Sequence, residues 1–531
     1  MGIWLSLAFL LLFAPCLQAK ERRETGSEKK KAAPLSFEDT KLRSLYSSLD
    51  PLSITQHLAF YELYPNTSYG HEALAKAWQL LSGKKEYTSL ENLPFPKLDI
   101  QAIISLVTRQ SFDPPAELTP DQLSVIEKIS EQLANRKLKG YTVWTEEEVI
   151  KLSPDEIDLG RALLISQFGD GSGSHFSIRQ YEASLDLMAL QIRARLSPDA
   201  SHEDKIREIN RFIFQEMLFR FPPHSLHAKD IDLYTFLPSV IDSRQGVCLG
   251  VSILYLSLAQ RLELPLEIIT PPGHIFLRYE SRDRVINIET TARGIHMPDE
   301  VYLGINTRKL ERRNIKEVAG LAFMNQAAVF WGKEQYETAV HLYEKAQKFL
   351  EGDKLLKMFL GMNYLFVGKK KEGRKLLEEL QGLTFDSAVS AETIPDDYLK
   401  GRVDTEGLKI IFLPVDETRA SVVKKQAEIK AILKRYPLFR AGIFQLATTW
   451  LQLGRGSEAL EVLKRYHEVD PTSSTVEYYL SIVSLQRMDY LRAWEFLKQT
   501  ENLTHMRDHN PKSLKALRSQ LRHQCPEPRS I

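Results

Sequence analysis

The feature that most constrains the fold is a spacing of 34 residues between small side chains in the C-terminal half. Ala339 and Gly373 are 34 residues apart, and so are Ala459 and Ala493. A small residue at a fixed position lets two helices pack closely, and a repeat of this length accommodates one helix pair. The spacing therefore predicts an all-helical array in which each pair buries its apolar face against its neighbours. A generic helical bundle is the alternative.

Aromatic, small and turn-forming residues occupy matching positions in each predicted pair. They are Tyr336, Tyr343, Ala346, Leu360, Gly361, Tyr364, Gly368, Ala447, Trp450, Gly454, Pro471 and Tyr490. With this pattern residues 318–510 resemble tetratricopeptide repeats, which implies a solenoid that binds a protein or peptide partner. The pattern is absent from about 383 to 422, where Pro395 and Pro414 stand. We expect this stretch to interrupt the array.

A second constraint lies upstream, where a turn residue, a cysteine and an apolar segment follow one another. Gly246 precedes Cys248, and residues 249–262 are mostly apolar helix formers. Cys248 therefore falls at a predicted helix N-terminus. The positive end of a helix dipole, together with a nearby imidazole, lowers the pKa of a thiol and favours the nucleophilic thiolate.

Three short segments rich in β-branched and aromatic residues come next and predict an antiparallel sheet. They are residues 266–270, 275–279 and 285–291. A two-residue turn at Ser281-Arg282 would place His274 directly opposite Glu289, close enough for the carboxylate to orient the imidazole. A register slip of two residues would place Asn287 opposite His274, so Asn287 is the reserve third member of the site.

Cys248, His274 and Glu289, in this order, resemble the thiol site of the papain-fold, transglutaminase-like superfamily. Over residues 155–295 the sequence resembles its bacterial SirB-type branch, through GVCLGVSILYL, PGHIFLRY and NIETT, which begin at residues 246, 272 and 287. The resemblance implies an α+β core in which the helix carrying the cysteine packs on an antiparallel sheet. It also implies Cys248 as nucleophile, His274 as general base and acid, and Glu289 as the residue that orients His274.

Each of these residues has an ordinary interpretation when taken alone. Cys248 could be a small buried side chain, His274 a core histidine and Glu289 a solvated strand residue. Their combination on a helix start and two strands predicts catalysis. Gln245 and the backbone N–H of Cys248 are candidates for stabilising the oxyanion of a tetrahedral intermediate.

Two functions are consistent with this sequence. In the first, an exported thiol enzyme acts on amide or ester bonds, either as a hydrolase (protease or amidase) or by acyl transfer to an amine. The repeats would then present a substrate or a partner. In the second, the core is catalytically inactive and the protein is an adaptor whose repeats bind a partner protein. The complete set of Cys248, His274 and Glu289 favours the first.

The N-terminus predicts export. Residues 3–14 are apolar except for Ser6, a segment too short to span a bilayer and suited to a signal peptide. Leu17-Gln18-Ala19 fits a cleavage site, so we expect a periplasmic or secreted protein. Lipidation at Cys16 is an alternative that Pro15 argues against.

Composition excludes several other classes. The formal net charge is +1, which gives no indication of nucleic-acid binding. Past the predicted signal peptide no segment reaches about 18 apolar residues, so we expect no stable membrane span. Of three cysteines, only Cys248 and Cys525 would remain after cleavage, which implies no disulfide framework. His224 and His227 lack further ligands at metal spacing. We expect no metal and no cofactor, and the oligomeric state is not predicted.

The predicted organisation is then complete. It comprises a signal peptide (1–19), a disordered linker (20–36), a helical N-terminal region (37–115), a transglutaminase-like domain (116–310), the repeats (318–510) and a flexible tail (511–531) in which Cys525 would be exposed. Within the first part of the transglutaminase-like domain we expect helices at residues 120–135, 153–167, 177–196 and 202–219.

Overall fold

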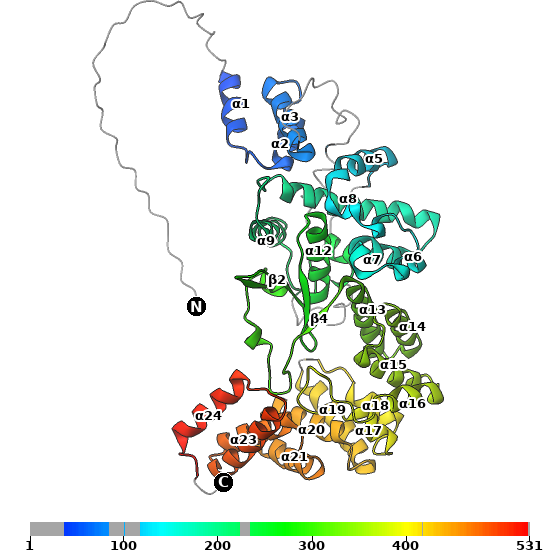
Figure 1. The fold of residues 1–531 in the computed structure, drawn as a ribbon, viewed down its shortest axis with the longest axis vertical. Coiled ribbons are helices and arrows are strands. Elements are labelled where there is room, and N and C mark those ends of the chain that lie inside the picture. The colour runs from blue at the N-terminus through cyan, green and yellow to red at the C-terminus, as the bar shows by residue number, and fades with distance from the viewer. Residues whose placement is uncertain (1–36, 84–99, 101–116, 223–233, 417, 529–531) are drawn as a thin grey trace, which may run out of the picture. The chain divides into compact units, whose positions relative to one another are not determined.

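The computed structural model describes residues 37–83, 100, 117–222, 234–416 and 418–528 (Figure 1). The predicted signal peptide with Cys16, the predicted linker, parts of the N-terminal region, and His224 and His227 lie outside these ranges. The chain divides into two compact units, Met1–Ser48 and Leu49–Ile531. The described part of the first is essentially helix α1 (Phe37–Ser47). All that follows concerns the second unit.

Seven helices among the described residues precede the predicted cysteine helix and its short leading helix. They are α2 (Ile54–Leu63), α3 (Ser68–Ser82), α5 (Pro120–Ile129), α6 (Glu146–Lys151), α7 (Leu159–Phe168), α8 (Ser172–Arg193) and α9 (His202–Asn210). Reciprocal side-chain caps start three of them, since Thr119 pairs with Gln122 at α5, Thr145 with Glu148 at α6 and Ser201 with Asp204 at α9.

Three of the predicted helices are shorter than expected. The first ends at Ile129, after which Leu133 and Leu138 adopt extended backbone between short 3-10 turns. Both leucines direct the chain into separate turns instead of a continued helix. The one expected from residue 153 begins only at Leu159, after a 3-10 turn at Pro154–Glu156. The last predicted helix changes at Arg211 into a wider π-helical turn, Arg211–Glu216.

Helix α12 (Cys248–Arg261) is the centre of the transglutaminase-like region, and the short helix α11 (Leu237–Ser243) leads into it. Every residue of α12 is buried except Cys248 and Gln260. A helix that is apolar around its whole circumference must lie inside the protein. A Cβ at Gly250 would stand 2.1 Å from the carbonyl oxygen of Tyr234, so only glycine permits this close approach.

The sheet beside α12 has the strand order β3-β2-β1-β4 and is antiparallel throughout. Its strands are β1 (Glu267–Thr270), β2 (Phe276–Glu280), β3 (Val285–Ile288) and β4 (Glu311–Arg313). The first three were predicted. The fourth was not, because its sequence, Glu-Arg-Arg, carries no apolar signal.

The predicted register between β2 and β3 is wrong by two residues. The turn centres on Arg282-Asp283, because the Ser281 N–H donates to the Arg284 carbonyl oxygen at 2.9 Å. Leu277 therefore faces Ile288, and both are fully buried. Across the ladder from Asn287, Arg278 donates its Nε to the Asn287 Oδ1 at 2.8 Å, and this pair helps to fix the observed register.

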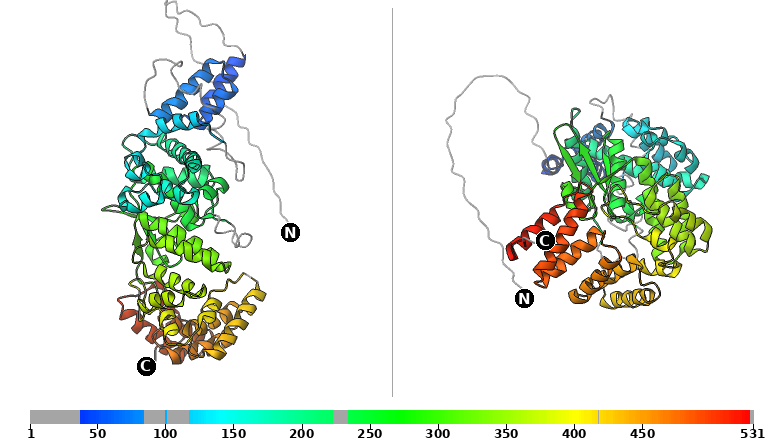
Figure 2. Two further views of the ribbon diagram at one scale, coloured as in Figure 1. Left: turned by 90° about the vertical axis from the view of Figure 1, so that its right-hand side faces the viewer. Right: turned by 60° about the horizontal axis from the view of Figure 1, so that its bottom comes forward.

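Helix pairs follow the sheet and pack in chain order (Figures 1 and 2). The elements are α13 (Ile315–Gly332), α14 (Tyr336–Gln347), α15 (Lys354–Phe366), α16 (Lys370–Glu378), α17 (Ile394–Leu399), α18 (Thr405–Ile411), α19 (Arg419–Arg435), α20 (Arg440–Gln452), α21 (Gly456–Val469), α22 (Ser474–Gln486), α23 (Tyr490–His505) and α24 (Lys512–Gln524). In the parts of the chain described, none of the helices is long and apolar enough to cross a membrane.

The 34-residue period is confirmed by these pairs. Helices α14 and α16 begin 34 residues apart, as do α21 and α23. Ala339, Ala459 and Ala493 are fully buried, and a Cβ at Gly373 would stand 2.6 Å from the Gly361 carbonyl oxygen. The small residues therefore sit where two helices touch. The fold is an α+β transglutaminase-like core followed by an all-α solenoid of tetratricopeptide type.

The predicted interruption of the array holds two short helices, α17 and α18, and the start of α19. Asp397 of α17 is fully buried and accepts hydrogen bonds from Arg440 at the start of α20, through the backbone N–H at 2.9 Å and the Nη2 at 2.8 Å. Arg440 also reaches Asp470 at 2.8 Å. Buried charge therefore holds the two halves of the array together.

The prediction of a flexible tail is wrong, because α24 occupies most of it. Leu514, Leu517 and Leu521 are buried in a cluster that includes Trp494. Their spacing of three and four residues gives the helix an apolar face that the many basic residues around it obscure. Cys525 is partly buried, and its carbonyl oxygen accepts a hydrogen bond from the Trp494 Nε1 at 3.2 Å.

A loop ahead of β4 contacts the far end of the array. The Gly304 carbonyl oxygen accepts a hydrogen bond from the His509 Nε2 at 2.7 Å. Arg308 donates its Nη1 to the Arg507 carbonyl oxygen at 2.5 Å and its backbone N–H to the Ser387 carbonyl oxygen at 2.9 Å. The transglutaminase-like region and the repeats are thus joined by this loop as well as by the chain entering α13.

We expect Asp397→Asn to loosen the junction within the array. The substitution removes the buried carboxylate charge that faces Arg440, at a cost of about 3 kcal/mol. Hydrogen exchange of the α20 amides, measured by mass spectrometry, should accelerate accordingly. Glu428→Gln, an exposed change on α19, is the matched control and should alter stability by less than about 0.5 kcal/mol. Unchanged exchange in Asp397→Asn would contradict this account of the junction.

Candidate active site

Cys248 is the first residue of α12, as predicted. Val247 precedes the helix and offers no side-chain acceptor to its first N–H groups, so these groups point out of the helix end. The entering chain is fixed by backbone hydrogen bonds, from Gly246 N–H to the Arg220 carbonyl oxygen and from Val247 N–H to the Tyr234 carbonyl oxygen, both at 3.1 Å. The partly buried thiol therefore stands at the positive end of a rigid helix.

His274 lies in the turn before β2. Gly273 has a φ of 71°, and the His274 N–H donates to the Pro271 carbonyl oxygen at 3.0 Å, which closes the turn. The ring Nε2 is 2.7 Å from the Glu289 Oε2. The Cys248 thiol is the other group whose influence on the ring raises the pKa of His274. Since Nε2 is engaged by Glu289, Nδ1 is the ring nitrogen that remains for the thiol.

Glu289 is held by four donors. Its Oε2 accepts from His274 and from the Tyr302 hydroxyl, the latter at 2.5 Å. Its Oε1 accepts from the Thr291 hydroxyl at 2.6 Å and the Thr291 N–H at 3.1 Å. The side chain is 5% exposed. A buried carboxylate with every lone-pair direction engaged has one orientation, and through it the imidazole has one orientation too.

The pair of His274 and Glu289 forms in spite of the wrong register. Neither residue lies in a ladder, since β2 begins at Phe276 and β3 ends at Ile288. The chain leaves the sheet at Glu289, whose N–H donates to the Ile295 carbonyl oxygen at 3.0 Å. The contact is made between two segments just beyond the ends of their strands, and the sheet positions it without including it.

A polar link ties this turn to the cysteine helix. The hydroxyls of Ser252 and Thr290 are 3.1 Å apart, and the Thr290 hydroxyl donates to the Cys248 carbonyl oxygen at 3.4 Å. Thr290 directly follows Glu289, so the link sets the distance between the carboxylate and the helix that carries the thiol. The three predicted catalytic side chains are therefore brought together from α12, the turn before β2 and the turn after β3.

The charged forms of His274 and Glu289 stabilise each other. Burial disfavours the charged imidazole, but the hydrogen bonds with Cys248 and Glu289 outweigh it and raise the pKa of His274 to about 9. Burial likewise disfavours the carboxylate, yet donors from His274, Thr291 and Tyr302 lower the pKa of Glu289 to about 2. Near neutral pH the site holds an imidazolium between a carboxylate and a sulfur atom.

Tyr302 was missed by the sequence analysis. Besides its hydrogen bond to Glu289, its ring stacks on His274 with centroids 5.8 Å apart and on Phe276 at 4.5 Å. Burial and the neighbouring carboxylate raise the pKa of its phenol, so the hydroxyl stays a donor. No spacing rule places it, because it stands in an irregular loop that only the three-dimensional fold brings back to the site.

Asn287, the reserve third member, does not face His274. Its Oδ1 accepts from Arg278, and its Nδ2 donates to the Met297 carbonyl oxygen and the Asp299 Oδ1, both at 2.7 Å. Gln245 is buried three residues before Cys248, and its Oε1 has no hydrogen-bond partner among the described residues. Within the same residues no cluster of three His, Cys, Asp or Glu side chains could hold a metal ion.

The pKa of His274 predicts a pH-dependent contribution to stability. Because the folded value of about 9 exceeds the free value of 6.5, the charged ring raises the free energy of unfolding below pH 6.5, and this contribution is lost as the pH rises through 9. We expect the melting temperature of the parent to exceed that of His274→Gln at pH 6.5 and below. This difference in melting temperature should shrink by about 2 to 4 °C or more as the pH rises through 9.

Thermal unfolding of both proteins across the range measures this margin. His341→Gln is the matched control, because His341 is exposed on α14. The difference in melting temperature between the parent and this variant should be small at every pH. A margin between the parent and His274→Gln that stays constant with pH would contradict the assignment of an imidazolium at this position.

Comparisons with known proteins agree with this architecture. A family model described as the transglutaminase-like superfamily matches residues 179–314, which include the whole candidate site. A UPF0162 protein of Haemophilus influenzae is 30% identical over 123 residues, which are 23% of this chain and 42% of the relative. A UPF0162 protein of Pseudomonas aeruginosa is 28% identical over 129 residues, or 24% of this chain and 46% of the relative. The chain thus spans less than half the length of these curated relatives.

Solved structures of repeat proteins also match. They include TTC0263, a thermophilic TPR protein of Thermus thermophilus, with 13% identity over 39% of this chain and 98% of that chain, and a TM-score of 0.20. The TPR2AB-domain:pHSP90 complex of yeast Sti1 matches with 18% identity over 40% of this chain and 89% of that chain, also with a TM-score of 0.20. Scores this low carry no weight, so the repeat assignment depends on the helix pairs themselves. Residues 179–314 form a transglutaminase-like domain, and helix pairs of tetratricopeptide type follow it.

Proposed function

We propose that the protein is a thiol enzyme of the SirB-type branch that acts on the carbonyl carbon of an amide or ester. The observation that carries the proposal is the position of His274, which shares a hydrogen bond of 2.7 Å with the Glu289 carboxylate and whose pKa is raised by the Cys248 thiol. An imidazole between a thiol and an acid is the arrangement that activates a cysteine for acyl transfer.

Catalysis would proceed through a thioester. The Cys248 thiolate forms a bond to the carbonyl carbon, and the π electrons move to the oxygen. The tetrahedral intermediate collapses as its bond to the leaving nitrogen or oxygen breaks, and the His274 imidazolium donates the proton that this group needs. An acceptor then loses a proton to the neutral His274 and attacks the thioester carbon. The C–S bond breaks as the second tetrahedral intermediate collapses, which restores the thiolate and imidazolium pair.

The oxyanion would be stabilised at the start of α12. The backbone N–H of Cys248 belongs to the first turn, whose N–H groups have no acceptor within the helix. Gln245, buried three residues away, is the proposed side-chain donor. A backbone donor at the helix start and a side-chain donor in the segment that leads into it would match the charge that develops on the carbonyl oxygen.

The proposal also covers the acyl acceptor, the role of the helix pairs and the location of the protein. Water as acceptor makes the protein a hydrolase, and an amine makes it an acyltransferase. The helix pairs would bind the protein or peptide that carries the substrate, as concave faces of such arrays bind peptides. The apolar segment at residues 3–14 supports export to the periplasm or beyond.

We expect Cys248 to react with iodoacetamide at least about tenfold faster than Cys525 at about pH 6, where an ordinary thiol with a pKa of about 8.5 is almost wholly protonated. Peptide mass spectrometry of one sample reads both rates, so Cys525 serves as the internal standard. His274→Gln should abolish the difference and His341→Gln should preserve it. Equal rates for the two cysteines in the parent would leave the adaptor function as the better account.

We also expect p-nitrophenyl acetate to acetylate Cys248, with a burst of about one nitrophenolate per chain. Intact and peptide mass spectrometry locate the acetyl group. Cys248→Ser should lose the burst at neutral pH, since a hydroxyl is far less acidic than a thiol. Tyr302→Phe should keep the fold but slow acetylation by about tenfold, because the carboxylate that orients His274 loses one donor. Acetylation elsewhere, or none, counts against the enzyme.

A further inference from the structure

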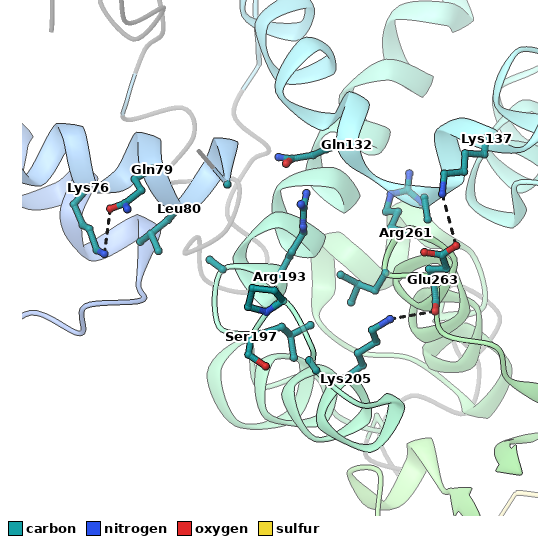
Figure 3. Close-up of a pocket in the computed structure, with 17 residues that line it drawn as sticks. Lys76, Gln79, Leu80, Gln132, Lys137, Arg193, Ser197, Lys205, Arg261 and Glu263 are labelled. Atoms are coloured by element: carbon teal, nitrogen blue, oxygen red, sulfur yellow. Dashed lines mark hydrogen bonds and ion pairs between the residues drawn. The ribbon is translucent and has the colours of Figure 1, made fainter. Parts of the chain in front are cut away.

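A second site lies at the opposite end of the cysteine helix. Arg261 ends α12, about 20 Å along the helix axis from Cys248 at 1.5 Å per residue. It lines a cavity of about 680 Å³ together with residues from α3, α8 and α9 (Figure 3). This volume is typical of pockets that hold a small molecule. The cavity shares no residue with the candidate active site.

Positive charge dominates this cavity. Lys76 of α3, Lys137 of the 3-10 turn Ala134–Lys137, Arg193 of α8 and Lys205 of α9 line it, and Glu263 is the one carboxylate among its lining residues. Figure 3 shows that these cations come from different elements around one space. Four cations against one carboxylate leave three positive charges without a carboxylate partner in the lining.

The contacts within the cavity do not neutralise these positive charges. Lys137 is 3.7 Å from Glu263, and both side chains are about three-quarters exposed, so the pair is weak. Lys76 donates to the Gln79 Oε1 and Lys205 to the Glu263 carbonyl oxygen, each at 3.3 Å, and both acceptors are neutral. The Arg193 side chain makes no hydrogen bond or ion pair with any residue in the described ranges.

Arg261 is the buried cation among the residues that line the cavity. Its side chain is fully buried, its Nε donates to the Asp186 Oδ1 at 2.8 Å, and its Nη1 donates to the Ser257 carbonyl oxygen. The buried Nη2 has no partner among the described residues. A buried guanidinium nitrogen without an acceptor is costly, so the positive charge of Arg261 adds to the field of the cavity that the residue lines.

Three helix ends offset part of this charge. Gly83, Ala194 and Leu262 cap the C-termini of α3, α8 and α12, and all three line the cavity. Each C-terminus carries about half a negative charge, so together they contribute about −1.5. The uncompensated cations exceed this sum, and the cavity keeps a net positive charge.

We propose that this cavity binds a soluble small molecule that carries phosphate groups. A phosphate monoester bears about −1.5 to −2 charges near neutral pH and presents oxygens in several directions. Cations that approach from several elements match that geometry, whereas a planar carboxylate is satisfied by one guanidinium fork. Arg193 is the main anchor, with Lys76 and Lys205 at its sides.

Isothermal titration of the full-length chain with sodium pyrophosphate tests the proposal. We expect one site with a Kd on the order of 100 μM or tighter. Arg193→Gln should weaken binding by at least about tenfold. Arg419→Gln, which removes the same charge from an exposed position on α19, is the matched control and should change the Kd by less than about twofold.

Glu263→Gln guards against a trivial loss through misfolding. Removing the one carboxylate of the lining should tighten pyrophosphate binding by about threefold, a gain that a damaged protein would not show. Cys248→Ala should bind as the parent does, which separates this site from the proposed catalysis. The proposal is overturned if pyrophosphate does not bind, if Arg193→Gln and Arg419→Gln behave alike, or if citrate binds as tightly as pyrophosphate.

Discussion

The burial of α12 is the constraint on which the rest of the transglutaminase-like region depends. The helix is apolar on every side, so it is stable only when other elements surround it. Apart from the hydrogen bond of Ser252 with Thr290, its charged and reactive groups lie at its two ends. At the N-terminus Cys248 faces His274, and at the C-terminus Arg261 joins Asp186 in the interior. One buried helix thus fixes a reactive group and a charged cavity at a set separation, and neither can move without repacking the core.

The sequence predicted those features that depend on composition and period. The 34-residue spacing located the helix pairs, and the apolar segment after Gly246 placed Cys248 at a helix start. The strand register was mispredicted because a shift of two residues leaves every side chain on the same face, so the hydrophobic pattern cannot distinguish the alternatives. Local polar contacts decide it instead, namely the Ser281 turn and the pair of Arg278 with Asn287. Tyr302 could not be found because a loop with no period brings it to the site.

The carboxylate of the site shows how the fold stabilises a buried charge. Glu289 would be costly at 5% exposure without partners. Thr291 is two residues away and engages one oxygen, while Tyr302 and His274 share the other. Half of these donors come from the adjacent sequence and half from distant segments. The two donors of Thr291 orient the Glu289 carboxylate as soon as the turn forms. The donors from Tyr302 and His274 reach it only when the sheet and the loop that follows it are in place.

The contact between the Gly304 loop and the end of the array has a mechanical consequence. The chain leaves the sheet through α13, passes along the helix pairs and returns by His509 to the Gly304 carbonyl oxygen, so covalent and hydrogen-bonded links form a closed circuit. A helical array attached at one end can change its curvature without affecting the rest of the protein. When both ends are attached, a change in curvature also strains the second attachment. Gly304 is two residues from Tyr302. A change in the curvature of the array therefore exerts a force on the loop that supports Glu289. The stiffness of that loop determines how much Tyr302 and Glu289 are displaced.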